Sequence, residues 1–400
     1  MARELKMADL WKAVGNIVWN EWFWFPEKYT WDCMKNTNPN VYKPQSSDLW
    51  MPVYLCFVIT LIRTVFERVV AFVGERVFDL RQPTKTAPVN PILEKVYAKK
   101  KTPDNSTIQD LSKQTDMKVR QIERWFRHRR NQDRTPVIKK FCESSWRCTY
   151  YAVIFCYGMY TLWDKEWLWK TEMCWKGWPE HHVSADLYWY YAIQAGFYLS
   201  LSLSLFVDHK RKDFMEMIVH HFATLGLMFF SWMNNFVRVG SLVLLIHDCA
   251  DPIMEAAKMA KYVKKDGVCN SLFVLFILTW IATRMTIFPF RIIYSTLFEA
   301  VPEIGICFVY YVYNTLLITL QVLHIIWFYF IVLIAKEAII TGGQVKKDSR
   351  SSDETISDDS SSNGKECSKR REHPINKNGL AQLEQNGTVN PLSCGDRGDL

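Results

Sequence analysis

The stretch HHFATLGLMFFSWMNNFVRVGSLVLLIHDCAD, residues 220–251, is strongly apolar and yet holds three histidines and two aspartates. A charged side chain at the centre of a lipid bilayer costs about 2.5 to 3.5 kcal/mol. We therefore expect titratable groups in such a segment only where a helix bundle buries them and they serve a function. The stretch predicts both the fold, a bundle of membrane-spanning helices, and the place of a functional site.

The rest of the chain repeats this alternation of apolar blocks and polar loops. Of the 400 residues, 49% are hydrophobic and 15% are aromatic. A run of about 20 apolar residues crosses a hydrocarbon core of about 30 Å, and on this measure we expect an all-α polytopic membrane protein, a bundle of about seven transmembrane helices. The predicted spans are 51–74, 146–164, 185–207, 216–233, 239–257, 271–293 and 305–336.

Basic residues in the loops predict the orientation. Loop 75–145, residues 208–214 and residues 258–267 are rich in Lys and Arg, and all three lie on one side if seven spans are correct. The positive-inside rule assigns that side to the cytosol, so the N-terminus is luminal and the C-terminus cytosolic. Residues 1–50 are a luminal segment with an aromatic cluster. Residues 342–400 are a cytosolic tail that we expect to be disordered, because it has too little apolar surface to offset the entropy of ordering.

The eleven cysteines are scattered singly, with no Cys-x-x-Cys pair, which argues against a zinc site. Cys33 and Cys174 both fall on the predicted luminal side. The sequence leaves open whether they form a disulfide, and free thiols in or near the membrane are the simpler interpretation.

Helical spacing groups the polar side chains of residues 220–251. Thr224 follows His221 by three residues and His220 by four, so its hydroxyl can reach either imidazole. His247 and Asp248 precede Asp251 by four and three residues and share a face with it. A histidine beside a carboxylate is the usual means of moving a proton, or of making a nitrogen nucleophile, near neutral pH. Two alternatives stay open: histidines that only hydrogen-bond backbone carbonyls, and, less favoured, a metal site of His and Asp ligands.

Residues 83–135 alternate short amphipathic stretches with a polar turn and end in a basic helix. They resemble a homeodomain that lacks the start of its first helix, with ERWFRHRR, residues 123–130, aligned on the family's WFxNRR core. Such a module is a small three-helix insert. His128 stands where homeodomains have the Asn that contacts adenine, so we expect Trp125 and Phe126 to anchor the module's core rather than to contact nucleic acid. A basic helix discriminates poorly among the phosphates of DNA, lipid headgroups and coenzyme A. The basic side chains that follow Phe126 are Arg127, Arg129 and Arg130.

Residues 208–263, DHKRKDFMEMIVHHFATLGLMFFSWMNNFVRVGSLVLLIHDCADPIMEAAKMAKYV, resemble the Lag1 motif of ceramide synthases. They lie inside a region, 139–341, that resembles a TLC domain. The FWFP cluster at 23–26, the homeobox-like module and FPFRIIYST at 288–296 are also similar to the animal members of that family. The resemblance therefore covers nearly the whole chain before the tail. The motif residues matched are His220, His221, Thr224, Ser231, Asn235, Arg238, Gly240, His247, Asp248, Asp251, Glu255, Lys258 and Tyr262.

The resemblance implies an endoplasmic-reticulum enzyme that transfers a fatty acyl group from acyl-CoA to the amine of a sphingoid base, giving ceramide or dihydroceramide. In that family the paired histidines and the motif aspartates are required for activity; here these are His220, His221, Asp248 and Asp251. A sphingoid amine is mostly protonated at neutral pH and must lose a proton before it attacks a thioester. We expect His220 to be the base or nucleophile, His221 to be its partner with an exchangeable role, and the two aspartates to orient the rings.

The two substrates involve further residues. The phosphates of CoA would stay cytosolic, near Lys210, Arg211 and Lys212, while both fatty tails lie in the apolar bundle, which excludes water. The resemblance also points to the short luminal loop near Ser295–Gly305 as the determinant of acyl length. The other predicted substrate-binding side chains are Thr224, Ser231, Asn235, Arg238 and His247.

Beyond acyl-CoA, a sphingoid base and membrane lipids, we expect no cofactor and no metal, and we leave a homo- or heterodimer open. The endoplasmic-reticulum membrane is the expected location, with the nuclear envelope as an alternative. Two other functions compete: a noncatalytic TLC-domain lipid carrier or translocon accessory, and a membrane-tethered homeobox regulator. The complete His and Asp set argues against the first. His128 argues against DNA binding by the module, although a dual role stays open.

Overall fold

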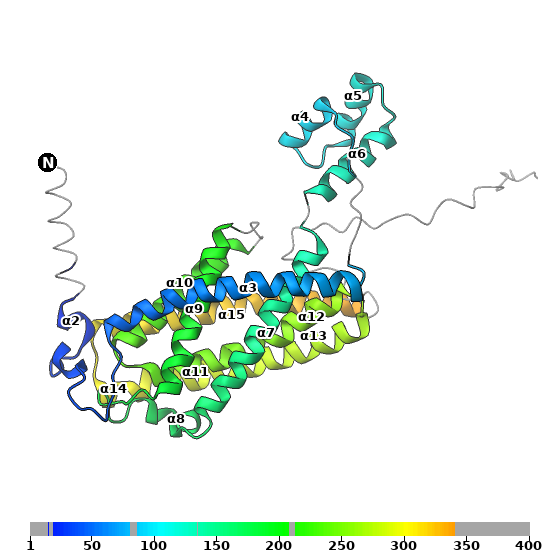
Figure 1. The fold of residues 1–400 in the computed structure, drawn as a ribbon. Coiled ribbons are helices and arrows are strands. Elements are labelled where there is room, and N and C mark those ends of the chain that lie inside the picture. Colours follow the sequence, from blue (N-terminus) through cyan, green and yellow to red (C-terminus); the bar gives the residue numbers. More distant parts are fainter. Residues whose placement is uncertain (1–14, 16–18, 81–85, 134, 208–212, 341–400) are drawn as a thin grey trace, which may run out of the picture. The chain divides into compact units, whose positions relative to one another are not determined.

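The computed structural model describes residues 15, 19–80, 86–133, 135–207 and 213–340, and within these ranges its regular secondary structure is helical, with no strand. Long helices run along one another, and a separate group of three short helices, α4 to α6, carries the module (Figure 1). The predicted tail, 342–400, lies outside the described residues, and so do Lys210, Arg211 and Lys212.

The helices of the bundle follow the chain order, with short helical turns between them. The short elements are α2 (Glu21–Trp24), η1 (Trp31–Met34), η2 (Ser46–Leu49), α8 (Glu166–Trp169) and η3 (Thr171–Cys174). The long elements are α3 (Trp50–Val77), α7 (Val137–Leu162), α9 (Ala185–Val207), α10 (Phe214–Met233), α11 (Val237–Asp248), α12 (Asp251–Tyr262), α13 (Asp266–Trp280), the π-helix η4 (Ile281–Ile293) with η5 (Ser295–Glu299) and α14 (Ala300–Ile304), and α15 (Phe308–Ile340).

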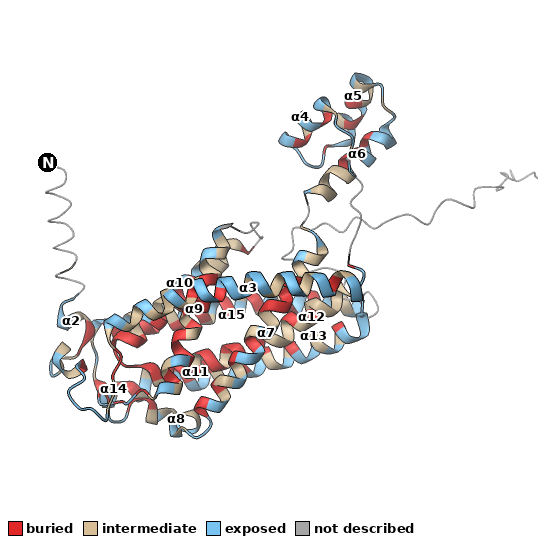
Figure 2. Cartoon of the chain, in the orientation of Figure 1, coloured by how far each residue is buried: buried red, intermediate tan, exposed pale blue. Residues whose placement is uncertain are grey.

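Four helical stretches are long and apolar enough to cross a membrane: Ser46–Val77, Phe214–Met233, Asp266–Ile304 and Phe308–Ile340. Their outer faces are exposed (Figure 2), and on α3 the exposed side chains are large and apolar, as for Phe57 and Leu61. Such a surface is stable against lipid tails and unfavourable in water. The chain is therefore a membrane protein, and that the remaining predicted spans also cross the bilayer stays a prediction.

The predicted span 239–257 is not one helix. α11 ends at Asp248 and α12 begins at Asp251, although Cys249 and Ala250 between them keep helical backbone angles. Pro252 accounts for the break, because proline has no N–H for an intrahelical bond and restricts the residue before it.

The predicted loop Ser295–Gly305 is largely helical, and the chain turns only at Gly305, where φ is 94°. The polar side chains at the start of this segment bond inside the bundle. Thr296 Oγ1 lies 3.0 Å from Ile293 O and 2.9 Å from Asn314 Oδ1, and its hydroxyl hydrogen can be donated to either acceptor. Ser295 Oγ accepts from Trp175 Nε1 at 2.8 Å.

The module consists of α4 (Pro91–Lys99), α5 (Asn105–Thr115) and α6 (Val119–Gln132) around its own apolar core. The prediction that Trp125 and Phe126 anchor this core is confirmed, since their side chains are 3% and 2% exposed. Tyr97 donates its hydroxyl to Asp133 Oδ2 at 2.8 Å, and Arg129 also contacts Asp133. Burial works to raise the pKa of Asp133, but the hydrogen bonds from Tyr97 and Arg129 outweigh it and lower that pKa below its usual value.

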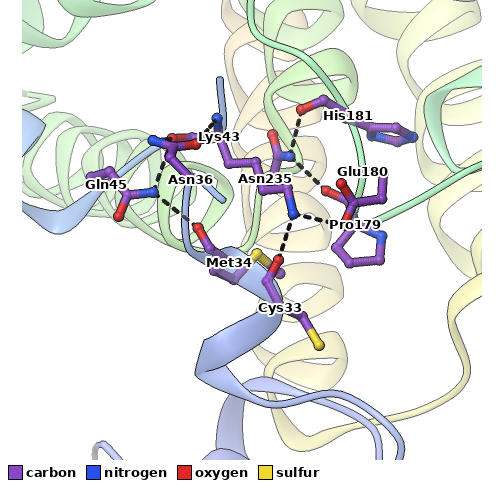
Figure 3. Close-up of polar contacts among 9 residues, drawn as sticks. All are labelled: Cys33, Met34, Asn36, Lys43, Gln45, Pro179, Glu180, His181 and Asn235. Carbon is purple, nitrogen blue, oxygen red and sulfur yellow. Dashed lines mark hydrogen bonds and ion pairs between the residues drawn. The ribbon is translucent and has the colours of Figure 1, made fainter. Parts of the chain in front are cut away.

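One end of the bundle is closed by three segments far apart in the sequence: residues 19–49, residues 163–184 and the turn 234–236, together called the cap. Lys43 Nζ donates to Cys33 O at 2.8 Å and to Glu180 Oε1 at 2.6 Å (Figure 3). Asn235 Nδ2 donates to Pro179 O at 3.0 Å and to His181 O at 2.8 Å. These polar bonds join the three segments of the cap to one another.

Asn235 and His181 show how closely the cap is packed. Asn235 has φ of 53°, in the left-handed region that Asn tolerates better than most residues, and this turn joins α10 to α11. Burial, together with the nearby charge of Arg238, lowers the pKa of His181 to about 4. The imidazole is therefore neutral at physiological pH.

Candidate functional site

Residues of α9, α10, α11, η5 and α15 enclose a mostly apolar cavity, called here the central cavity. The space between its lining atoms, part of which is open to the surroundings, amounts to about 540 Å³. α10 packs against α9, α11 and α15, and α11 packs against η4, so the cavity lies between helices that contact one another. The polar residues of the Lag1-like motif that line it are His220, Thr224, Ser231 and His247.

His220 is partly buried in the cavity wall, with its ring centroid 5.2 Å from that of Trp327. Its Nδ1 is buried and has no hydrogen-bond partner among the described residues. The neighbouring ring of His221 is 5.7 Å away between centroids and is not part of the lining. Successive residues of an α-helix project about 100° apart, so only one of the paired histidines faces the cavity.

His247 pairs with a histidine that the sequence analysis missed. Its Nε2 lies 3.0 Å from His324 Nε2, and its Nδ1 lies 2.6 Å from Val243 O. Because a carbonyl only accepts, Nδ1 of His247 carries hydrogen, and in the neutral ring Nε2 then accepts from His324. His324 is 1% exposed, and its own Nδ1 has no partner among the described residues. The pair holds His247 in one tautomer and one orientation.

The two aspartates have different partners, neither of which is a histidine. Gln194 of α9 donates to Asp248 Oδ2, while Asp248 Oδ1 is buried without a partner in the described residues. Arg284 of η4 donates to Asp251 Oδ1 at 3.0 Å and to the backbone oxygen of His247 at 2.8 Å. Arg284 therefore links the two helices that the break at Cys249 and Ala250 separates. Its guanidinium also lies 4.2 Å from the centre of the Trp280 ring, a cation–π contact.

The remaining predicted substrate-binding residues lie in different places. Ser231 shares a hydrogen bond with Tyr191 in the cavity wall, and Thr224 lines the same wall. Asn235 and Arg238 contact the cap instead: Arg238 Nη1 donates to Met173 O at 2.8 Å. The structure thus brings part of the predicted site into one cavity and uses Asn235 and Arg238 to join α11 to the cap.

The structure also bears on the metal site and the disulfide considered from the sequence. In the described part of the chain, no group of three or more His, Cys, Asp or Glu side chains is placed to hold a metal ion. Cys33 and Cys174 are free thiols, the second buried.

On α6 of the module, His128 is partly buried, and Arg129 Nε donates to Glu94 Oε1 at 2.8 Å. This arginine of the basic helix is therefore engaged within the module.

Comparison with known proteins matches this architecture. A model of the TLC domain matches residues 140–333, and a homeodomain model matches residues 83–135. Ceramide synthase 5 of Mus musculus is 44% identical over 340 residues, 84% of this chain and 81% of the relative. Ceramide synthase 4 of Bos taurus is 38% identical over 375 residues, 93% of each chain. Ceramide synthase hyl-1 of Caenorhabditis elegans is 32% identical over 343 residues, 83% of each chain. The resemblance drawn from the motif is confirmed.

Proposed function

The chain belongs to the ceramide synthase family, and from this premise we propose that it is an acyl-CoA-dependent sphingoid base N-acyltransferase whose reaction takes place at His220 in the central cavity. The observation that carries the proposal is an imidazole with an unpartnered ring nitrogen, set in an apolar cavity between helices. Such an apolar setting keeps the reacting groups away from water, which would hydrolyse the thioester.

In this reaction His220 acts as the base. It takes a proton from the sphingoid ammonium group, and the free amine attacks the thioester carbonyl carbon. The C–N bond forms, the C–S bond breaks, and the second amine proton goes to the departing CoA sulfur, so the products are an amide and a thiol. The same imidazole could first take the acyl group as an acyl-imidazole and then pass it to the amine. Acyl-CoA is a substrate in either route, and neither route needs a further cofactor or a metal.

The other polar residues position this group. His221 lies beside His220, and Thr224 lies one helical turn along the cavity wall. The His247–His324 pair and Arg284 fix the neighbouring helix. Asp248 and Asp251 contribute by position: their hydrogen bonds go to Gln194 and Arg284, which join α11 and the start of α12 to α9 and η4.

The test compares two site variants, His220→Ala and Asp248→Asn, with two control variants in the cap, His182→Ala and Asp164→Asn. Both control residues are exposed. Microsomes with either site variant should lose incorporation of labelled acyl-CoA into ceramide while the protein still inserts. The two control variants should keep it. Undiminished activity of both site variants would refute the assignment. A labelled acyl group that remains covalently on the unchanged enzyme, but not on His220→Ala, would favour the acyl-imidazole route.

We also propose that the protein lies in the endoplasmic-reticulum membrane with a luminal N-terminus and a cytosolic C-terminus. The excess of Lys and Arg in loops 75–145 and 258–267 supports this orientation. Protease protection of sealed microsomes tests it: an epitope at the C-terminus should be cleaved from outside, and one at the N-terminus should be protected. Protection of both, or cleavage of the N-terminal epitope, would contradict the orientation.

A further inference from the structure

A second apolar cavity, called here the side cavity, lies next to the central cavity. It is bounded by α9, α10, the start of α3 and η2, and the space between its lining atoms, part of which is open to the surroundings, is about 610 Å³. Its wall includes Pro52, Val53, Ala195 and Leu199, and Asp48 lies at the η2 side. No polar residue of the Lag1-like motif lines it. The side cavity is therefore a mostly apolar space that holds none of the motif histidines.

Two side chains, Tyr191 and Met228, line both cavities. They form a partition, since one face of each borders the central cavity and another borders the side cavity. Both are buried, at 2% and 5% exposure. The ring of Tyr191 also lies 5.5 Å from that of Trp232, centroid to centroid.

Tyr191 is held in this position from two sides. Its hydroxyl shares a hydrogen bond with Ser231 of α10. On α11, a Cβ at Gly240 would lie 2.5 Å from the Tyr191 hydroxyl and 2.9 Å from Ser231 Oγ. Only a residue without a side chain leaves room for this pair, so Gly240 permits the close approach that keeps the partition closed.

The partition lies at the far end of the central cavity from the histidines. At 1.5 Å per residue, Ser231 is about 16 Å along α10 from His220, and Gly240 is about 10 Å along α11 from His247. An acyl chain that extends from His220 along α10 toward Ser231 therefore approaches Tyr191. The hydroxyls of Tyr191 and Ser231 bond each other at this end, and a longer chain would have to displace them.

We propose that Tyr191, with Met228, is a determinant of acyl-chain length: it closes the central cavity and keeps the acyl chain out of the side cavity. This rests on the proposed acyl transfer and adds to it the residues that select among acyl-CoA substrates. Removing the ring joins the two cavities and lets longer chains be accommodated.

The experiment uses the full-length protein in microsomes with sphinganine and a series of saturated acyl-CoAs of increasing length. Tyr191→Leu should raise the ratio of kcat/KM for the longest over the shortest acyl-CoA by about tenfold or more, the scale that methylene groups contribute in a hydrophobic pocket. Ser231 keeps a backbone acceptor in this variant, Met228 O at 3.3 Å. Met228→Ala opens the same partition from α10 and should shift the ratio in the same direction. The ratio is informative even when the amount of folded protein falls, because less enzyme lowers all the rates alike.

A second substitution tests the role of the side cavity. Ala195→Phe fills that cavity and should leave the length preference of the otherwise unchanged protein as it is. Combined with Tyr191→Leu, it should cancel the gain for long chains. A length preference that is unchanged in both active partition variants, or a gain that survives Ala195→Phe, would overturn the proposal while leaving acyl transfer intact. Absence of acyl transfer by the unchanged protein would instead refute the proposed function and this proposal with it.

Discussion

Replacing Arg284 tests whether a buried ion pair holds the site together. Its side chain is 5% exposed and that of its partner Asp251 is 14% exposed. Arg284→Met keeps much of the length of the side chain but removes its charge and its hydrogens. It leaves the Asp251 carboxylate and the backbone oxygen of His247 without this donor.

The expected loss follows from these two contacts. An unpaired charge inside a membrane bundle costs about 2.5 to 3.5 kcal/mol, and the lost bond to a neutral carbonyl adds about 1 kcal/mol. Together they agree with the roughly 3 to 5 kcal/mol expected when one partner of a buried pair is removed. The double variant Arg284→Met/Asp251→Leu removes both charges and should regain about 2 to 3 kcal/mol of this stability. It should remain inactive if Asp251 serves the reaction.

The assay combines thermal unfolding in detergent with acyl transfer in microsomes. Arg284→Lys is the matched control: it keeps the charge but not the planar fork that reaches two acceptors, so it should fall between the parent and Arg284→Met. An Arg284→Met protein that unfolds at the parent temperature would refute the reasoning. A double variant less stable than the single one would refute it as well.

Three further predictions concern the cap and the module. Lys43→Met should speed limited proteolysis of the cap, because the Cys33 carbonyl loses its donor at a cost of about 1 to 3 kcal/mol of stability. The control variant, Glu180→Gln, changes a largely exposed side chain and should cost about 1 kcal/mol or less. Lowering the pH from 7 to 5 should destabilise the cap by at most about 1.4 kcal/mol per pH unit. The unfolded His181 ring takes up a proton near 6.5 and the folded ring only near 4, so His181→Asn should remove this dependence, as measured by hydrogen exchange. Asp133→Asn should reduce the hydrogen-exchange protection of α6 at neutral pH. In the unchanged protein that contribution should be lost only as the pH falls below the ordinary carboxyl range and through the lowered pKa of Asp133.

Hydropathy located most long helices because lipid demands long apolar runs, and such runs are visible in one sequence. Hydropathy failed where a proline interrupts the backbone hydrogen bonds of a helix. The average hydropathy of 239–257 hides the effect of Pro252, which divides that stretch into α11 and α12. Hydropathy also ended the sixth span at residue 293, whereas the segment taken as the loop Ser295–Gly305 continues as helix to Ile304.

The part of the site that lies in residues 220–251 was predictable, since His220, Thr224 and Ser231 of α10 and His247 of α11 all line the central cavity. The spacing of His220 and Thr224 placed both on the same cavity, as helical periodicity requires. His324 and Gln194 come from helices distant in the sequence, and one polar residue in an apolar run does not reveal its partner. Arg284 could have been identified from the sequence, because a charge in a predicted span needs a counter-charge.

One ion pair of the cap joins residues 137 positions apart in the chain, Lys43 and Glu180. At a translation speed of about 5 to 20 residues per second, the ribosome needs on the order of 10 s to supply Glu180 after Lys43 has been made. During biosynthesis the N-terminal segment must therefore wait, its aromatic side chains uncovered and its lysine without a carboxylate. That interval makes the nascent chain a client for chaperones well before the last helix is translated.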